Sequence, residues 1–196
     1  MTDAIVQGIL LGGLYALFAA GLSIVFGVMK IVNLAHGDLI ILSAYVTMVV
    51  VDTTGLNPLA TVAAVGAVMA VFGYLLQRGI VNFTLGSGLL PPLVVTFALG
   101  LIIQNVLLEV FTADTQGLDA GGIELTGQQL PGGVVVGWFP VLTFLLAVVV
   151  LAALQLVISR TRLGRAFRAI SDDEDTAALM GVHARHVFAL ATALAM

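Results

Sequence analysis

Residues Lys30 to Asp38 read Lys-Ile-Val-Asn-Leu-Ala-His-Gly-Asp and interrupt a sequence that is otherwise apolar from Ala4 to Val51. An Asp at the centre of a membrane-inserted helix costs about 2.5–3.5 kcal/mol, against roughly 0.3–0.6 kcal/mol gained for each Leu or Ile. Polar clusters at membrane depth are usually buried in protein or border a water-filled path. The stretch therefore predicts a break in a membrane-spanning helix, beside a path through the membrane.

The composition of the 196-residue chain is that of a membrane protein. Hydrophobic residues make up 60% of it and charged residues 9%, whereas soluble domains average about 45–50% apolar and 25% charged residues. Apolar runs of this length predict helices, because lipid offers no partner for unpaired backbone groups and barrel strands are much shorter. We therefore expect an all-α fold, a polytopic transmembrane helix bundle in a single domain over residues 1–196.

Five apolar spans and the start of a sixth are predicted. The second contains the break, and its uninterrupted part, Leu39–Val51, reaches only about 20 Å at 1.5 Å per residue, whereas the hydrocarbon core is about 30 Å thick. Residues Asn33 to Asp38 are therefore expected to lie inside the membrane, and the second helix to be discontinuous. The spans are Ala4–Val28, Ile31–Val51, Pro58–Leu76, Pro92–Phe111, Trp138–Ile158 and a sixth from about Val187.

The basic residues predict the orientation of the chain. All seven lie in or beside connections on one side, whereas the opposite connections carry acidic residues and no Lys or Arg. Because cytoplasmic loops are enriched in Lys and Arg, we expect a multi-pass protein of the cell (inner) membrane with cytoplasmic basic loops and the N-terminus outside. The external loop, residues 112–137, contains two β-like pieces, 123–126 and 134–136, that predict a small hairpin. The basic residues are Lys30, Arg78, Arg160, Arg162, Arg165, Arg168 and Arg185.

The cytoplasmic loop at residues 160–186 is the second informative stretch. A basic arm opens it, and Ser171 with Glu174 then forms a capping box, with acids in the first helical turn. Gly181 supplies the left-handed residue that ends a helix. A helix of about nine residues is marginal in water, so we expect a partner protein to receive its apolar residues 178–180. A helix resting on lipid headgroups is the alternative.

The sequence offers no chemistry of an enzyme. It has no cysteine, and no nucleophile, metal cluster or acid–base pair emerges, so we predict no catalytic residue, no metal and no cofactor. The G-x-x-x-x-G-K-[ST] loop that binds ATP is absent as well. Energy for transport would therefore come from a partner subunit or from an ion gradient. Gradient-driven carriers usually bury acids in their spans, and the candidates here are Asp38 and Glu109.

The polar residues of the break have structural and transport interpretations. Asp38 is placed to cap the helix that follows it, with Gly37 as the break, while Asn33 would bond freed backbone groups. His36 is a candidate for binding a substrate carboxylate or for pairing with Asp38. Gln104 of the fourth span is a candidate lining residue, with an interhelical hydrogen bond as the alternative. The candidate path residues are Asn33, His36, Gly37, Asp38 and Gln104.

Three stretches resemble the permeases of branched-chain amino-acid ABC importers. The first runs from Gly13-Leu-Tyr-Ala-Leu through residues 21–38 to Ala44-Tyr45 and resembles their opening. Residues 164–181 resemble their cytoplasmic loop, the family's version of the motif by which importer permeases engage the ATPase, and residues 96–105 also fit. Because family members run on for several more helices, the resemblance implies a C-terminally incomplete permease.

The resemblance implies a complex of two permease subunits, two cytoplasmic ATPases that bind the ATP, and an external solute-binding protein. It leaves open whether the second permease is a copy or a paralogue, and related permeases handle urea, amides and other hydrophobic amino acids. We expect contact with membrane lipid and none with nucleic acid. A gradient-driven or channel-like carrier and a non-transporting scaffold stay as alternatives. With the capping signals, the resemblance assigns ATPase coupling to Gly164, Arg165, Arg168, Ser171, Glu174, Ala177, Ala178, Leu179 and Gly181.

Overall fold

The computed structural model describes residues 2–55, 58–86, 88–112, 117, 127–130 and 134–196. Most of the described chain is helical, which confirms the all-α prediction. Five of the described helices, α1 to α5, are long and apolar enough to cross a membrane, and α8 is shorter. The elements are α1 (Thr2–Met29), α2 (His36–Thr54), α3 (Pro58–Gly79), the 3₁₀ turn η1 (Val81–Phe83), α4 (Leu90–Phe111), β1 (Gly127–Leu130), β2 (Val134–Gly137), α5 (Trp138–Arg160), α6 (Arg162–Asp172), α7 (Glu174–Leu179) and α8 (Ala184–Ala195).

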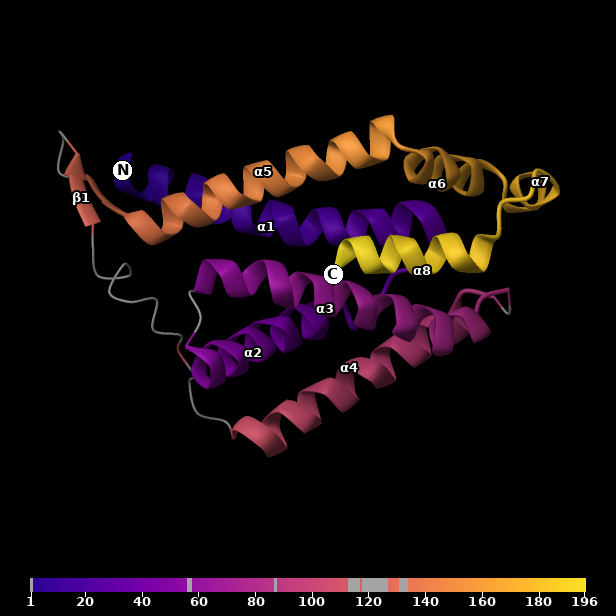
Figure 1. Cartoon of the computed structure of the whole chain (residues 1–196), viewed down its shortest axis with the longest axis horizontal. Coiled ribbons are helices and arrows are strands. Elements are labelled where there is room, and N and C mark those ends of the chain that lie inside the picture. The colour runs from indigo at the N-terminus through magenta and orange to yellow at the C-terminus, as the bar shows by residue number, and fades with distance from the viewer. Residues whose placement is uncertain (1, 56–57, 87, 113–116, 118–126, 131–133) are drawn as a thin grey trace.

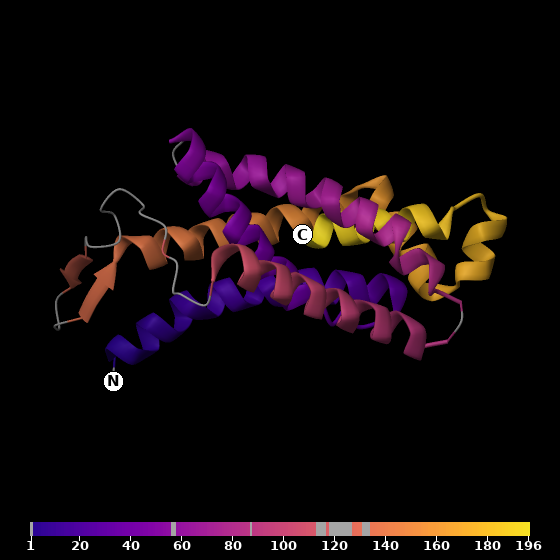
Figure 2. The same cartoon turned by 90° about the horizontal axis from the view of Figure 1, so that it is seen from below.

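The long helices run roughly side by side, so that their termini gather at two opposite ends of the bundle (Figure 1). Helix α1 packs along α5, α8 packs against both α3 and α1, and α2 contacts α3 and α4. The N-terminus and the two strands lie at one end, and α6 and α7 lie at the other, as the view turned by 90° also shows (Figure 2). All seven basic residues belong to elements or connections at the α6–α7 end.

The two strands form a small hairpin, and the second strand lies where the sequence predicts one. Strand β1 pairs antiparallel with β2, with Gly127 opposite Gly137 and Leu130 opposite Val134. The second strand matches the predicted piece at 134–136. The first strand is at 127–130, whereas the predicted piece at 123–126 lies outside the described residues.

Helix α1 ends because the backbone turns into the left-handed region. Lys30 has φ 56°, an uncommon conformation for a residue with a side chain, and its N–H donates to the Phe26 carbonyl at 2.8 Å. Residues 31–35 are not helical, and α2 begins at His36. The second span therefore consists of a non-helical stretch followed by one helix.

The buried core lies where α1, α3, α6 and α8 converge. Apolar residues from these helices and the break meet there, among them Val25, Ile31, Phe167 and Phe188. A polar group is buried beside them. The Thr192 hydroxyl of α8 donates to Gln77 Oε1 of α3 at 2.9 Å, and Gln77 Nε2 donates to Asn82 Oδ1 of η1 at 3.1 Å. These bonds fasten α8 to the end of α3, and no pattern in the sequence predicts them.

Candidate functional site at the helix break

The break lies beside the middle of its neighbouring helices. His36 Nε2 is 3.2 Å from the carbonyl oxygen of Phe18 in α1, and Phe18 precedes the last residue of α1, Met29, by eleven positions. At about 1.5 Å per residue, residues 30–35 thus carry the chain roughly 16 Å back along α1. Asp38 in turn faces Gly100, near the midpoint of α4. The start of α2 is therefore level with the central parts of α1 and α4.

Side chains accept hydrogen bonds from two of the backbone N–H groups that the break frees. The carboxamide oxygen of Asn33, which is 5% exposed, accepts from the Ala35 backbone N–H at 3.1 Å. The Leu34 N–H donates to the Thr96 hydroxyl of α4 at 3.3 Å. Asn33 thus bonds the break internally, and Thr96 bonds it to α4. Thr96 was not predicted as a site residue.

Asp38 joins α2 to α4 instead of capping α2. The helix begins two residues earlier, after Ala35 and without a side-chain cap, so Asp38 sits inside the first turn. Gln104 Nε2 donates to Asp38 Oδ1 at 2.8 Å. The prediction that Asp38 caps the helix is therefore wrong, as is the prediction that Gly37 forms the break, because Gly37 is part of α2.

His36 does not pair with Asp38, because its ring points to α1. The Phe18 carbonyl can only accept a hydrogen bond, so Nε2 carries the proton that it donates there. The other ring nitrogen, Nδ1, is buried and has no hydrogen-bond partner among the described residues. A buried polar group left unpaired costs about 1–3 kcal/mol. His36 therefore holds an unused hydrogen-bonding group at the level of the break.

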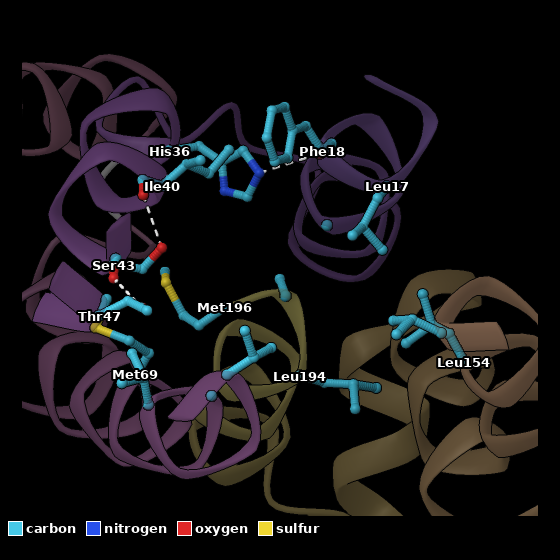
Figure 3. A pocket seen from close by; sticks show the side chains of 16 residues that line it. Leu17, Phe18, His36, Ile40, Ser43, Thr47, Met69, Leu154, Leu194 and Met196 are labelled. Atoms are coloured by element: carbon cyan, nitrogen blue, oxygen red, sulfur yellow. Dashed lines mark hydrogen bonds between the residues drawn. The ribbon is translucent and has the colours of Figure 1, made fainter. Parts of the chain in front are cut away.

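The His36 ring borders a cavity of about 330 Å³ at the centre of the bundle (Figure 3). Pockets for small molecules typically measure about 300–1,000 Å³. Residues 36, 40, 43 and 47 of α2 line one side at helical spacing, so they share one helix face. That spacing is readable in the sequence, but the polar members Ser43 and Thr47 were not predicted. The cavity is lined by Leu17, Phe18, Gly21, His36, Ile40, Ser43, Thr47, Val62, Val65, Gly66, Met69, Val150, Leu154, Leu194, Ala195 and Met196.

The predicted basic arm is the amphipathic helix α6, which is fixed to α5 and α1. Gly164 is buried so closely against α5 that a Cβ there would overlap the Ile158 carbonyl oxygen. Arg168 donates to that same oxygen at 2.8 Å, and the Ser171 hydroxyl donates to the Gly27 carbonyl of α1 at 2.7 Å. Arg165 is exposed. Helix α6 thus connects the end of α5 with the part of α1 that leads into the break.

Helix α7 is shorter than predicted and has a different N-cap. Ser171 lies within α6, so the predicted capping box with Glu174 is wrong. Asp173 caps α7 instead, accepting from the Thr176 N–H at 3.0 Å and from its hydroxyl at 2.9 Å. The backbone and then the side-chain hydrogen bond from Thr176 lower the pKa of the Asp173 carboxyl below its ordinary value. The predicted N-cap is lost because α6 runs on through Ser171 to Asp172, and the Ser171 hydroxyl is used in a hydrogen bond to the Gly27 carbonyl of α1.

The C-terminal end of α7 is as predicted. Gly181 has φ 84°, its N–H donates to the Ala178 carbonyl, and the next N–H donates to the Ala177 carbonyl. This pair of bonds is the Schellman pattern. Ala177 is 4% exposed and packs into the core, whereas Leu179 is 89% and Met180 81% exposed. The end of α7 therefore presents two large apolar side chains, and Glu174 and Ala178 are exposed with them.

The sequence profile of the family described as "Branched-chain amino acid transport system / permease component" matches residues 4–195. The chain belongs to this permease family. Together with the apolar helices, this membership makes the permease chain a multi-pass membrane protein. No solved structure matches it.

Curated relatives of the permease chain are permease proteins of branched-chain amino acid transport systems. The high-affinity branched-chain amino acid transport system permease protein BraD of Pseudomonas aeruginosa is 29% identical over 196 residues, covering 95% of this chain and 64% of that protein. The corresponding protein LivH of Escherichia coli is 28% identical over 199 residues, covering 94% and 63%. LivH of Salmonella typhimurium is 25% identical over 201 residues. The permease chain thus spans just under two thirds of the length of these relatives.

Proposed function

We propose that this chain forms a translocation path for branched-chain amino acids, as the permease subunit of an ABC importer. Family membership supports the proposal, and so does the relatives' description as branched-chain amino acid permeases. The observation that carries it in this chain is the break. A non-helical stretch at mid-span is tolerated only where it is buried in protein or lines a cavity, and α2 begins beside a central cavity.

Helix α7 is the proposed contact for a separate ATPase, which would bind the ATP. Its apolar tip, Leu179 and Met180, is exposed while Ala177 anchors it in the core. Movement of α7 would pass to α6, and through the hydrogen bond between Ser171 and Gly27 to the end of α1. The end of α1 leads directly into the break. Closure of the ATPases would therefore tilt the elements that border the cavity.

The same proposal sets the orientation and the remaining partners. The end of the bundle that carries α6, α7 and all the basic residues faces the cytoplasm, because cytoplasmic connections are enriched in Lys and Arg. The N-terminus and the hairpin of β1 and β2 face outside, where a solute-binding protein would deliver the amino acid. A second permease subunit completes the path.

The test is association with the ATPase. Replacing Ala178 and Leu179 together by Asp should abolish co-purification of a co-expressed ATPase, because charges replace the exposed tip, while membrane insertion is unchanged. Leu163→Asp with Ala169→Asp is the matched control, since both residues are exposed on α6. Retained co-purification in the first variant would show that α7 is not the contact.

Uptake measurements separate the importer from a gradient-driven carrier. The importer predicts uptake that requires the ATPase and is inhibited by vanadate. Uptake that collapses with an ionophore while ATP persists would replace the importer with a carrier. Asp38 would then be the first acid to examine, because it lies level with the middle of α4.

A further inference from the structure

A group of basic residues lies apart from the break, where α3 ends and α8 begins. Arg78 is in the last turn of α3, and His183, Arg185 and His186 stand at the start of α8. All four side chains are exposed. Together with Asn82 and Phe83 they line a cavity of about 430 Å³, here called the basic pocket. It lies at the end of the bundle that carries α6 and α7 (Figure 1).

The Tyr74 hydroxyl of α3 orients two of these side chains. Arg78 donates to the Tyr74 oxygen at 2.9 Å, and the same oxygen is 2.9 Å from His186 Nδ1. The rings of Tyr74 and His186 also meet edge to face, with centroids 5.7 Å apart. When the phenol proton is donated to Nδ1, the proton of the neutral imidazole is on Nε2. Arg78 and His186 are therefore held by one hydroxyl, and both keep N–H donors for a ligand.

The basic pocket offers hydrogen-bond donors and positive charge, and none of its lining residues is Asp or Glu. Neither Arg78 nor Arg185 has a carboxylate partner among the described residues, although Arg185 also borders an adjoining cavity that Glu174 lines. The carboxamide of Asn82 is already used, because it donates to the Arg185 carbonyl and accepts from Gln77. The ligand that suits this pocket is therefore an anion, and guanidinium groups match the oxygens of a phosphate especially well.

An exposed apolar face of α3 leads along the bundle to the basic pocket. Val68, Val71 and Leu75 are 59%, 61% and 60% exposed, and their spacing places them on one face of the helix. Arg78 follows Leu75 by three positions and continues that face. Phe83, at the pocket itself, is 76% exposed. The pocket thus lies where apolar surface gives way to positive charge, as at the level of phospholipid headgroups.

We propose that the basic pocket binds the phosphodiester of an anionic phospholipid through Arg78, Arg185 and His186, with the acyl chains along the exposed face of α3. Basic pockets between membrane helices are known to hold anionic headgroups. A zwitterionic lipid fits less well, because no carboxylate lines the pocket to receive its ammonium group. A water-soluble acidic partner would leave the adjoining apolar face without a contact.

The bound lipid would join two helices, since Arg78 belongs to α3 and Arg185 to α8. Helix α8 reaches the central cavity through Leu194 and Met196. The lipid would therefore hold in place one wall of that cavity. The ligand is a lipid and not the transported solute, so the site goes beyond the proposed function and does not depend on it.

Native mass spectrometry of the full chain, titrated with single lipids in detergent, tests the proposal. Phosphatidylglycerol and phosphatidylcholine with the same acyl chains are the two lipid probes, and inorganic phosphate is the third probe. Phosphatidylglycerol should bind more tightly than phosphatidylcholine. Equal affinity for the two lipids would overturn the proposal. Displacement of phosphatidylglycerol by an equal concentration of inorganic phosphate would also overturn it, because the site would then hold a free anion.

A charge-matched pair of variants separates a site from general attraction. Arg78→Gln with Arg185→Gln should weaken phosphatidylglycerol binding by about 30-fold, at about 5-fold for each basic residue near a headgroup. Arg162→Gln with Arg165→Gln removes the same charge from exposed residues of α6 at the same end, and it should weaken binding far less. Equal losses in the two variants would show that the attraction is spread over the surface and that the pocket is no site.

Tyr74→Phe tests the orienting hydroxyl, because it keeps every charge of the pocket. The preference for phosphatidylglycerol over phosphatidylcholine should fall about 2- to 10-fold, the range for one lost hydrogen bond. An unchanged preference would refute the role of Tyr74.

A phosphatidylglycerol with a photoreactive diazirine in its acyl chain locates the bound lipid on the unmodified chain. Labelled peptides should contain residues 68–75 of α3, and labelling confined to other helices would overturn the proposal. Co-purification with the ATPase gives the remaining outcome. If Arg78→Gln with Arg185→Gln abolishes it and leaves phosphatidylglycerol binding unchanged, the pocket contacts the ATPase and not a lipid.

Discussion

Replacing Gly164 by alanine tests how closely α6 must be held against the end of α5. The added Cβ would overlap the Ile158 carbonyl oxygen and lie 2.7 Å from Ile158 Cα, whereas carbon atoms in contact prefer about 3.5–4.0 Å. Backbone cannot rotate away as a side chain can, so α6 has to move by about 1 Å. Such overpacking typically costs about 1–3 kcal/mol. The equilibrium between docked and displaced α6 should therefore shift by about 5- to 150-fold toward the displaced state.

Cross-linking of two introduced cysteines by a short thiol-to-thiol reagent measures this displacement, because the chain has no cysteine of its own. Gly27→Cys and Ser171→Cys lie on the two sides of the contact in which the Ser171 hydroxyl donates to the Gly27 carbonyl at 2.7 Å. The reagent supplies the span between them, because a Cβ at position 27 meets nothing within 4 Å. The cross-linking yield should be high in this pair and fall sharply when Gly164→Ala is added. Gly66→Ala is the matched control, since a Cβ there meets nothing within 4 Å. Equal yields in the Gly164→Ala and Gly66→Ala backgrounds would refute the reasoning.

Three further outcomes are expected. Because the pKa of Asp173 is depressed below its ordinary value of 3.8, its cap stabilises α7 above that pH and is lost as the pH falls through the lower folded-state value. Hydrogen exchange would detect the loss as a lower protection factor of the α7 amides in acid. Thr192→Val should destabilise the chain by about 1–3 kcal/mol in detergent unfolding, because Gln77 Oε1 stays buried without its donor; no change would mean that water replaces the hydroxyl. A double-mutant cycle of Asp38→Leu and Gln104→Leu should give a coupling of about 0.6–1.7 kcal/mol, and additivity would show that their bond contributes nothing.

Sequence reasoning succeeded where a structural feature depends on a few neighbouring residues. The spans follow from the length and hydropathy of each run, and their observed bounds differ from the predicted ones by a few residues. The left-handed Gly181 is likewise a local property, because only glycine adopts that conformation without cost. The break could be predicted from the sequence because a cluster of polar residues is costly inside an apolar membrane span.

Sequence reasoning failed where tertiary packing decided which of two possible partners a side chain bonds. The capping box at Ser171 satisfies every local rule, yet α6 continues through Ser171 to Asp172, and the Ser171 hydroxyl bonds the Gly27 carbonyl of α1 instead of the backbone of α7. Asp38 was assigned to the backbone of its own helix, whereas its partner, Gln104, comes from α4. Two equally good local signals cannot be ranked without knowing what lies across the interface.

The sequence by itself determined that this chain is a bundle of membrane helices with one break, because apolar length and misplaced polar residues are properties of the chain alone. Only the tertiary structure decided which hydrogen-bond partners the residues of the break have. It brings His36 back along α1 to the Phe18 carbonyl, which fixes the proton on Nε2 and leaves Nδ1 buried without a hydrogen-bond partner among the described residues. The reason is physical: the hydrogen bond that sets the character of an imidazole comes from a residue eighteen positions away, and nothing in the intervening sequence encodes that approach.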